Sequence, residues 1–163
     1  MKWTISLIIG VIAISCSPII KSDGLSIEDL KSIHDLHENY RKYWLLNDSS
    51  KVVQLFAKHG ALIPPNNPRD FVRGRKNIAA WWFDVVDETS YPITGFEYSN
   101  DSLIIVDSNT AIWEGVSTVN WHTVVSDSII SSSQSSSNFI TVCSRTDSGW
   151  KILRQIWNVR PDK

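Results

Sequence analysis

A histidine and two aromatic residues share one side of the first helix that the sequence predicts. His37, Tyr40 and Trp44 are spaced three and four residues apart, so they lie on the same face of an α-helix. A histidine there can act as an acid, a base or a ligand-orienting donor, and a tyrosine hydroxyl can donate a hydrogen bond. The competing interpretation is that these are packed core side chains whose polar atoms bond to a carbonyl group or water. The pattern leaves both open.

An arginine in the last predicted strand is the third candidate for chemistry. Strand alternation assigns Arg154 to one face and its two sequence neighbours to the other. In an apolar cavity its guanidinium group can clamp a carboxylate, whereas elsewhere it is a paired or solvated surface residue. The face that carries Arg154 is predicted to carry Trp150, Ile152 and Ile156 as well.

Tryptophan is abundant, with eight residues in 163, and it serves both as core filler and as a lining for pockets. In residues 110–125, alternation puts Trp113 and Trp121 on one face and Glu114 and His122 on the other, without deciding which face is concave. Glu114 and His122 would be about 26 Å apart on an ideal strand, too far for a catalytic pair. As candidate ligand-binding residues we select Trp44, Trp82, Trp113, Ile63 and Ile156.

Other chemistry has little support in the sequence. His34 and His37 stand three residues apart, but no HExxH motif is present, so we expect no metal and no cofactor. Arg69, Arg73, Arg75 and Lys76 can hold an anion at a helix start or form a solvated loop, and no glycine-rich phosphate loop accompanies them. Cys143 lies in an apolar strand-like run and is predicted to be a small buried residue. A net charge of −1 argues against nucleic-acid binding.

The first residues resemble a secretory leader. MKWTISLIIGVIAISC begins with a lysine and continues with an apolar run too short to span a bilayer. The small residues before Cys16 resemble the bacterial lipoprotein box, in which the cysteine is lipidated. We therefore predict a signal peptide over residues 1–16, a tether over 17–25 and a protein held at the cell-envelope membrane by lipidated Cys16. An ordinary signal peptide and a secreted protein are the alternative.

The elements that must position the candidate residues change type along the chain. Ser26 and Asp29 form a capping-box pattern before an apolar stripe that runs from Ile27 to Trp44. A short second helix is expected from the Asn47-Asp48-Ser49 break to Gly60, and a third over residues 75–88. Between the last two, the sequence predicts short strands over residues 61–63, stopped by Pro64 and Pro65, and over residues 71–73.

From Pro92 onward the pattern is that of strands. Runs rich in β-branched and aromatic residues are separated by turn residues such as Asn100-Asp101, while the serine-rich stretch over residues 126–137 is predicted to be a long hairpin loop. Helices followed by a strand meander predict one α+β domain over residues 26–160, with a curved antiparallel sheet. The expected strands cover residues 95–98, 103–106, 110–125, 138–146 and 150–159.

Several motifs together resemble the nuclear transport factor 2-like superfamily, in its SnoaL-like and ketosteroid-isomerase-like branch. They are Trp44-Leu45-Leu46-Asn47-Asp48, Leu55-Phe56-Ala57, Ala61-Leu62-Ile63-Pro64-Pro65, Val72-Arg73-Gly74-Arg75 and Gly149-Trp150-Lys151-Ile152-Leu153-Arg154. The resemblance implies a cone: a bent sheet wrapped around three N-terminal helices and open at one end. Members often form homodimers through the outer face of the sheet.

The resemblance also shows what is missing. Ketosteroid isomerases of this fold carry a general-base aspartate just after the short first strand, and Pro64 stands about there. Since a fold does not name a function, three hypotheses remain: binding of a small apolar or aromatic molecule without catalysis; a lyase, isomerase or hydrolase that uses His37 or Tyr40 with Arg154; and a homodimeric interaction module with a filled cone. A cavity smaller than about 300 Å³ favours the last.

Overall fold

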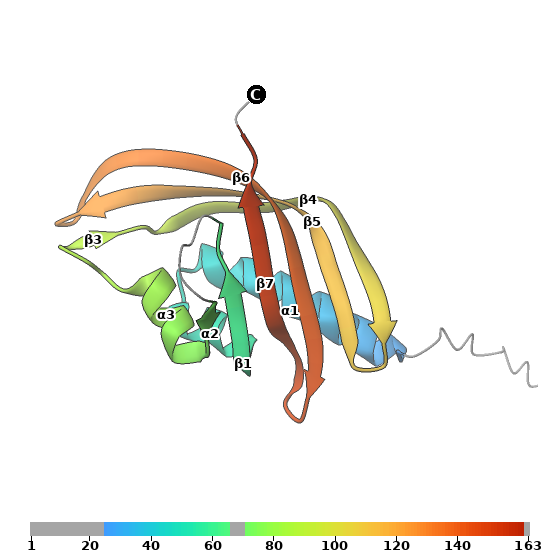
Figure 1. Ribbon diagram of the computed structural model, residues 1–163. Helices are drawn as coiled ribbons and strands as arrows, with labels where there is room; N and C mark the ends of the chain where they lie inside the picture. Colours follow the sequence, from blue (N-terminus) through green and yellow to red (C-terminus); the bar gives the residue numbers. More distant parts are fainter. Residues whose placement is uncertain (1–24, 66–70, 162–163) are drawn as a thin grey trace, which may run out of the picture.

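The computed structural model describes residues 25–65 and 71–161. The predicted signal peptide, Cys16 and nearly all of the tether lie outside these residues. Three helices and seven strands make up the described chain, and the sheet curves over helix α1 (Figure 1). The prediction of an α+β cone is thus confirmed. The elements are α1 (Ile27–Leu45), α2 (Ser49–Gln54), β1 (Phe56–Ile63), β2 (Val72–Arg73), α3 (Arg75–Phe83), β3 (Thr89–Ser90), β4 (Ile93–Asp107), β5 (Thr110–Val125), β6 (Ser128–Thr146) and β7 (Gly149–Val159).

The sheet has the strand order β2-β1-β7-β6-β5-β3, with β4 also paired to β5. All pairs are antiparallel except β1 and β7, which are parallel. The prediction of a wholly antiparallel sheet is therefore wrong at this one pair. The parallel pair is possible because the long crossover from β1 back to β7 runs through most of the domain.

Helix α1 begins with the predicted capping box, in which Ser26 and Asp29 each bond to the other's backbone N–H group. Its buried residues are Ile33, Leu36, His37 and Tyr40. Ile27 was predicted to belong to this stripe, but its side chain is 79 % exposed. At about 100° per residue, Ile27 lies roughly 110° from the centre of the stripe, so it points away from the sheet.

Strand β1 starts five residues earlier than predicted, at Phe56, and Gly60 lies inside it instead of ending a helix. A Cβ atom on Gly60 would be 3.0 Å from the carbonyl oxygens of both Ala57 and Ile152. This glycine therefore permits a close backbone approach, at the irregularity between Phe56 and Ala61 in the pairing with β7. Helix α3 is also shorter than predicted, because the backbone is already extended at Asp84.

The serine-rich stretch is a strand, so the prediction of a long loop there is wrong. A tight turn at Ser126 and Asp127, both with positive φ, joins β5 directly to β6. The register pairs Val125 with Ser128 and continues past Ser117 and Ser137. Serine is indifferent to strand or loop by local propensity, so the pairing with the β-branched residues of β5 decides its conformation.

Strand β4 is likewise continuous, although Asn100-Asp101 was predicted to be a turn. A register shift between Ser99 and Ser102 accommodates these residues as a bulge, and Asn100 has φ 50°. Gly115 faces the bulge, because a Cβ atom there would be 2.7 Å from the Asp101 Cα. The bulge brings the Asp101 carboxylate to Trp113, whose Nε1 donates to it at 2.9 Å.

Candidate functional site

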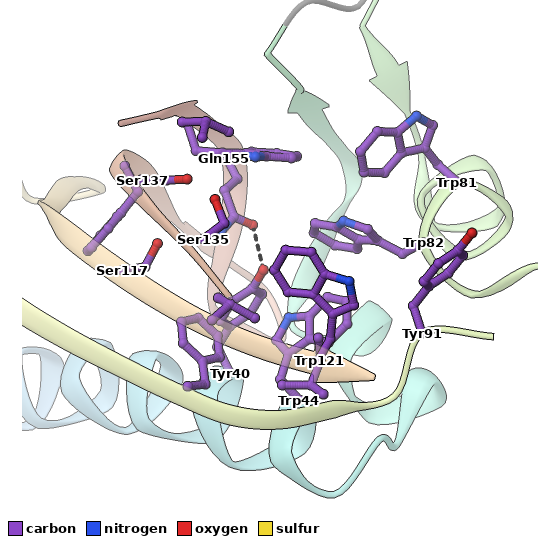
Figure 2. A pocket seen from close by; sticks show the side chains of 16 residues that line it. Tyr40, Trp44, Trp81, Trp82, Tyr91, Ser117, Trp121, Ser135, Ser137 and Gln155 are labelled. Atoms are coloured by element: carbon purple, nitrogen blue, oxygen red, sulfur yellow. Dashed lines mark hydrogen bonds between the residues drawn. The ribbon is translucent and has the colours of Figure 1, made fainter. Parts of the chain in front are cut away.

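The described chain forms a cavity of about 460 Å³, open on one side, between the concave face of the sheet, the second half of α1, and α3 with the segment that follows it (Figure 2). This volume lies within the range of small-molecule sites, about 300–1,000 Å³, and it speaks against a cone filled by its own side chains. The lining residues are Tyr40, Trp44, Trp81, Trp82, Tyr91, Ile93, Phe96, Ser117, Val119, Trp121, Ser135, Ser137, Phe139, Gln155, Trp157 and Val159.

Aromatic rings from several elements form one wall of the cavity. Trp82 of α3 stacks against Trp157 of β7, with ring centroids 6.2 Å apart and planes inclined by 29°. Trp44 of α1 meets Trp82 edge to face at 5.1 Å. Trp81 and Tyr91 remain exposed at 46 % and 58 %. This wall offers flat apolar surface inside the cavity and at its opening.

The lining contains no Asp, Glu, His, Lys or Arg among the described residues. Its polar atoms come from hydroxyl, amide and indole N–H groups, and the one hydrogen bond drawn in Figure 2 runs from the Tyr40 hydroxyl to Gln155 Oε1, at 3.0 Å. Burial raises the pKa of Tyr40, so the hydroxyl stays protonated at neutral pH and acts as a donor. The cavity is electrically neutral and mostly apolar.

Of the predicted site residues, Tyr40, Trp44 and Trp82 line the cavity. His37 does not: it lies one turn earlier on α1 and packs edge to face against Trp113 at 4.2 Å and Tyr98 at 4.5 Å. Its Nε2 is buried without a partner among the described residues. Burial lowers the pKa of His37 to about 3, so the imidazole is neutral and faces the core.

Arg154 also lies outside the cavity, so the structure does not bring together His37, Tyr40 and Arg154. Its Nη1 donates to the carbonyl oxygens of His59, at 3.1 Å, and of Leu153, at 2.7 Å. The guanidinium group thus braces the backbone where β1 and β7 run side by side. It has no access to a ligand in the cavity.

A bulge in β7 explains why the side chains that point into the cavity are not those predicted from strand alternation. Cys143 pairs with Ile152 but Val142 pairs with Arg154, which leaves Leu153 as an extra residue. After a bulge the alternation of side chains is reset by one residue. Gln155 and Trp157 therefore point into the cavity, in place of Arg154 and Ile156.

The other two predicted ligand-binding residues outside the lining are Trp113 and Ile63. Trp113 does share the concave face with Trp121, as the alternation predicted, but it lies nearer the start of β5, where residues of α1 such as His37 cover it. Ile63 pairs with Ile156 between β1 and β7, and neither contributes to the cavity wall.

The lining residues that sequence reasoning missed include three serines and a glutamine, which supply polar groups to the cavity. Ser117 falls on the same predicted face as Trp113 and Trp121, so strand alternation contained the signal for it. Ser135 and Ser137 lay in a stretch predicted to be a loop, and no pattern assigned them a face. Gln155 required knowledge of the bulge at Leu153.

The other residues considered for chemistry have structural roles or are not placed to act. Burial raises the pKa of the Cys143 thiol to about 12, which leaves it protonated and unreactive. Arg75, one of the basic residues considered for anion binding, donates from Nε to the carbonyl oxygen of Phe56 at 2.8 Å, so it links α3 to β1.

Across residues 25–65 and 71–161, no three His, Cys, Asp or Glu side chains are placed to hold a metal ion. No described helix is long and apolar enough to cross a membrane.

Comparison with solved structures finds similar folds at low sequence identity. A ketosteroid isomerase-like protein from Erwinia carotovora atroseptica superposes with a TM-score of 0.64 at 14 % identity, covering 84 % of this chain and 100 % of that chain. A nuclear transport factor 2-like superfamily protein from Salmonella enterica serovar Typhimurium has a TM-score of 0.64 at 16 % identity, covering 82 % and 92 %. A nuclear transport factor 2-like protein with a cystatin-like fold from Novosphingobium aromaticivorans has a TM-score of 0.61 at 19 % identity, covering 83 % and 84 %. No protein-family model and no curated protein matches the sequence.

Proposed function

We propose that this chain, which has the nuclear transport factor 2-like fold, binds a neutral, flat and largely apolar small molecule in its cavity. The observation that carries the proposal is a cavity of about 460 Å³ whose described lining holds no ionisable acid, base or cation. An ionic ligand would lose its hydration there without gaining a counter-charge, which is costly. A flat ring instead gains contact with the tryptophan wall.

Binding without catalysis is the form of the proposal that the site supports best. General acid–base catalysis needs a group that exchanges a proton near neutral pH. Tyr40 is held protonated by burial, His37 packs outside the cavity, and Pro64 stands about where an isomerase of this fold carries its base. A lyase, isomerase or hydrolase that relies on these side chains is the less favoured alternative.

Narrowing the cavity is expected to abolish binding. Val119 lines the cavity, while its neighbour Thr118 points to the opposite face and bonds to Ser136. The substitution Val119→Phe should weaken binding of naphthalene, a neutral flat probe, by at least about tenfold, because the added ring occupies the ligand's space. Quenching of tryptophan fluorescence by naphthalene measures this directly.

Thr118→Phe is the matched control, since it adds a ring of similar size on the other face of the same strand. Binding to this variant should equal that of the wild type. If the wild-type protein shows no saturable binding of naphthalene, and native mass spectrometry finds no small molecule on protein purified from its own host, the proposed function is refuted.

A homodimer is a second proposal, and a specific surface supports it. The convex face of the sheet carries an apolar group in register, with Ile104 opposite Ile112 and Ile140 opposite Ile156. Ile104, Ile140 and Ile156 are 44 %, 40 % and 36 % exposed. Neighbouring exposed isoleucines of this kind mark an interaction surface, and a twofold axis would bury them against the same group in a second copy.

A charge at the centre of this group should separate the two copies. We expect Ile140→Glu to convert a dimer into a monomer on size-exclusion chromatography with light scattering, since its carboxylate would be buried in the interface beside Glu114, which is opposite it in register. Ile129→Glu is the control, because Ile129 is 62 % exposed near the distant β5–β6 turn. A wild-type protein that is monomeric at micromolar concentration contradicts the proposal.

We also propose that the protein is held at the cell envelope by lipidated Cys16 and the tether that follows it. This proposal rests on the sequence of the leader, which lies outside the described residues. The mass of the mature N-terminus tests it: lipid on Cys16 supports the anchor, and an unmodified or absent Cys16 refutes it.

A further inference from the structure

The serine-rich half of β6 has two faces that differ in their hydrogen bonding. On the convex face each polar side chain is paired with one on β5: Ser136 with Thr118 at 2.9 Å, Gln134 with Asn120 at 2.7 Å, and Ser132 with His122 at 2.9 Å. This ladder satisfies the polar groups of that face within the protein.

The concave face shows the opposite situation. Ser117, Ser135 and Ser137 line the cavity, and their hydroxyl groups make no hydrogen bond to any described residue. Ser137 is only 7 % exposed. A bound molecule that shields these hydroxyl groups from water has to replace the lost hydrogen bonds, since each hydroxyl left unpaired would cost about 1–3 kcal/mol. Three of them at one place in a mostly apolar cavity therefore indicate where a bound molecule presents polar atoms.

These hydroxyls are grouped on one side of the cavity. Ser117 and Ser137 are directly opposite each other in register, and Ser135 is two residues further along the same face of β6. Figure 2 shows them with Gln155 across the cavity from Trp81, Trp82 and Tyr91. Gln155 accepts from Tyr40 through Oε1, which leaves its NH₂ group as a further donor.

We propose that the ligand is a hydroxylated aromatic compound that carries two or more oxygen atoms along one edge. The inference rests on the proposed function and specifies its ligand class. The flat face of the ring lies against the tryptophan wall, and the oxygen-bearing edge lies against Ser117, Ser135 and Ser137. Serine hydroxyls both donate and accept, so they suit phenolic groups, which do the same.

Two features of the site favour this class over its rivals. Side chains directly opposite in an antiparallel pair have Cβ atoms about 5 Å apart, which suits oxygens on alternate carbons of one ring. A saccharide carries hydroxyl groups around its whole rim and needs polar partners on every side, whereas here the lining is polar on the serine side and aromatic opposite. An organic anion would lack a counter-charge among the described lining residues.

The test compares naphthalene with 1,3-dihydroxynaphthalene on the full protein by isothermal titration calorimetry. The wild type should bind the diol more tightly. The double variant Ser117→Ala with Ser137→Ala should weaken diol binding by about 5- to 160-fold, at about 0.5–1.5 kcal/mol for each of two hydrogen bonds, and leave naphthalene binding equal or stronger. The matched control is Ser132→Ala with Ser136→Ala, which removes hydroxyls from the convex face of the same strand and should leave both affinities unchanged.

Each result has a defined meaning once circular dichroism shows that the variants are folded. Naphthalene that binds as tightly as the diol, or an equal loss for both probes in the double variant, overturns this inference and leaves the proposed function standing. Tighter binding of cellobiose than of the diol assigns the serines to a saccharide and also overturns it. Failure of both ring probes to bind the wild type overturns this inference, and together with the absence of a small molecule on protein purified from its own host it refutes the proposed function itself.

Discussion

Replacing His37 with phenylalanine is expected to remove most of the loss of stability that the protein suffers in acid. Burial lowers the pKa of folded-state His37 to about 3, whereas an unfolded histidine titrates near 6.5. Between these values the unfolded chain binds a proton that the folded chain does not. The free energy of unfolding therefore falls as the pH falls from about 6.5 to 3, by up to about 5 kcal/mol from this residue.

The aromatic shell around His37 explains both the shift and the choice of phenylalanine. Trp113, Tyr98 and Phe139 meet the imidazole edge to face at 4.2, 4.5 and 5.6 Å. Burial lowers the pKa of His37 most strongly. The negative charge of Asp101 partly offsets this lowering, whereas nearby His34 lowers the pKa further. A phenyl ring can keep the edge-to-face contacts, and it removes the Nε2 atom that has no partner among the described residues.

Urea unfolding at pH 7, 6, 5 and 4 checks this prediction. The wild type should lose stability steadily below pH 6.5, whereas His37→Phe should have a much flatter profile. His59→Phe is the control: His59 is exposed on β1, and this variant should keep the wild-type slope. An unchanged slope in His37→Phe would mean that the acid sensitivity has another origin.

The substitution Phe56→Ala is expected to cost about 3–5 kcal/mol of folding free energy, because it leaves a void that the surrounding side chains fill only in part. Phe56 has no exposed surface, and its ring lies 5.7 Å from Trp82 and 6.4 Å from Tyr40, centroid to centroid. It thus supports two residues of the cavity wall from behind. A domain of this size has a total stability of about 5–15 kcal/mol, so the loss is large.

Phe71→Ala is the matched control for this variant. Phe71 is 43 % exposed, and its ring contacts the Arg73 guanidinium group at 4.6 Å. Its removal should cost about 0.5 kcal/mol or less, as is usual for surface substitutions. Thermal and urea unfolding give both values. If Phe56→Ala loses no more free energy of unfolding than Phe71→Ala, packing around Phe56 does not stabilise the core as proposed. The Phe56 variant should also bind naphthalene more weakly, since Trp82 loses its support.

Local patterns in the sequence were sufficient for much of the fold. The capping box at Ser26 and Asp29 and the apolar spacing that follows it predicted the start and inward face of α1, because both depend on residues within one or two helical turns. The abundance of β-branched and aromatic residues after Pro92 predicted the strands. The placement of Tyr40, Trp44 and Trp82 in the cavity wall agrees with their selection from the sequence, although their role in binding is still a proposal.

The composition of the cavity was decided by tertiary structure. A single extra residue at Leu153 turns Gln155 and Trp157 inward and leaves Arg154 outside, and pairing with β5 makes a strand of the serine-rich stretch. Side chains alternate with a period of two, so a shift of one residue exchanges the two faces of a strand. Such a shift depends on the partner strand, which is distant in sequence, so local propensity cannot predict it.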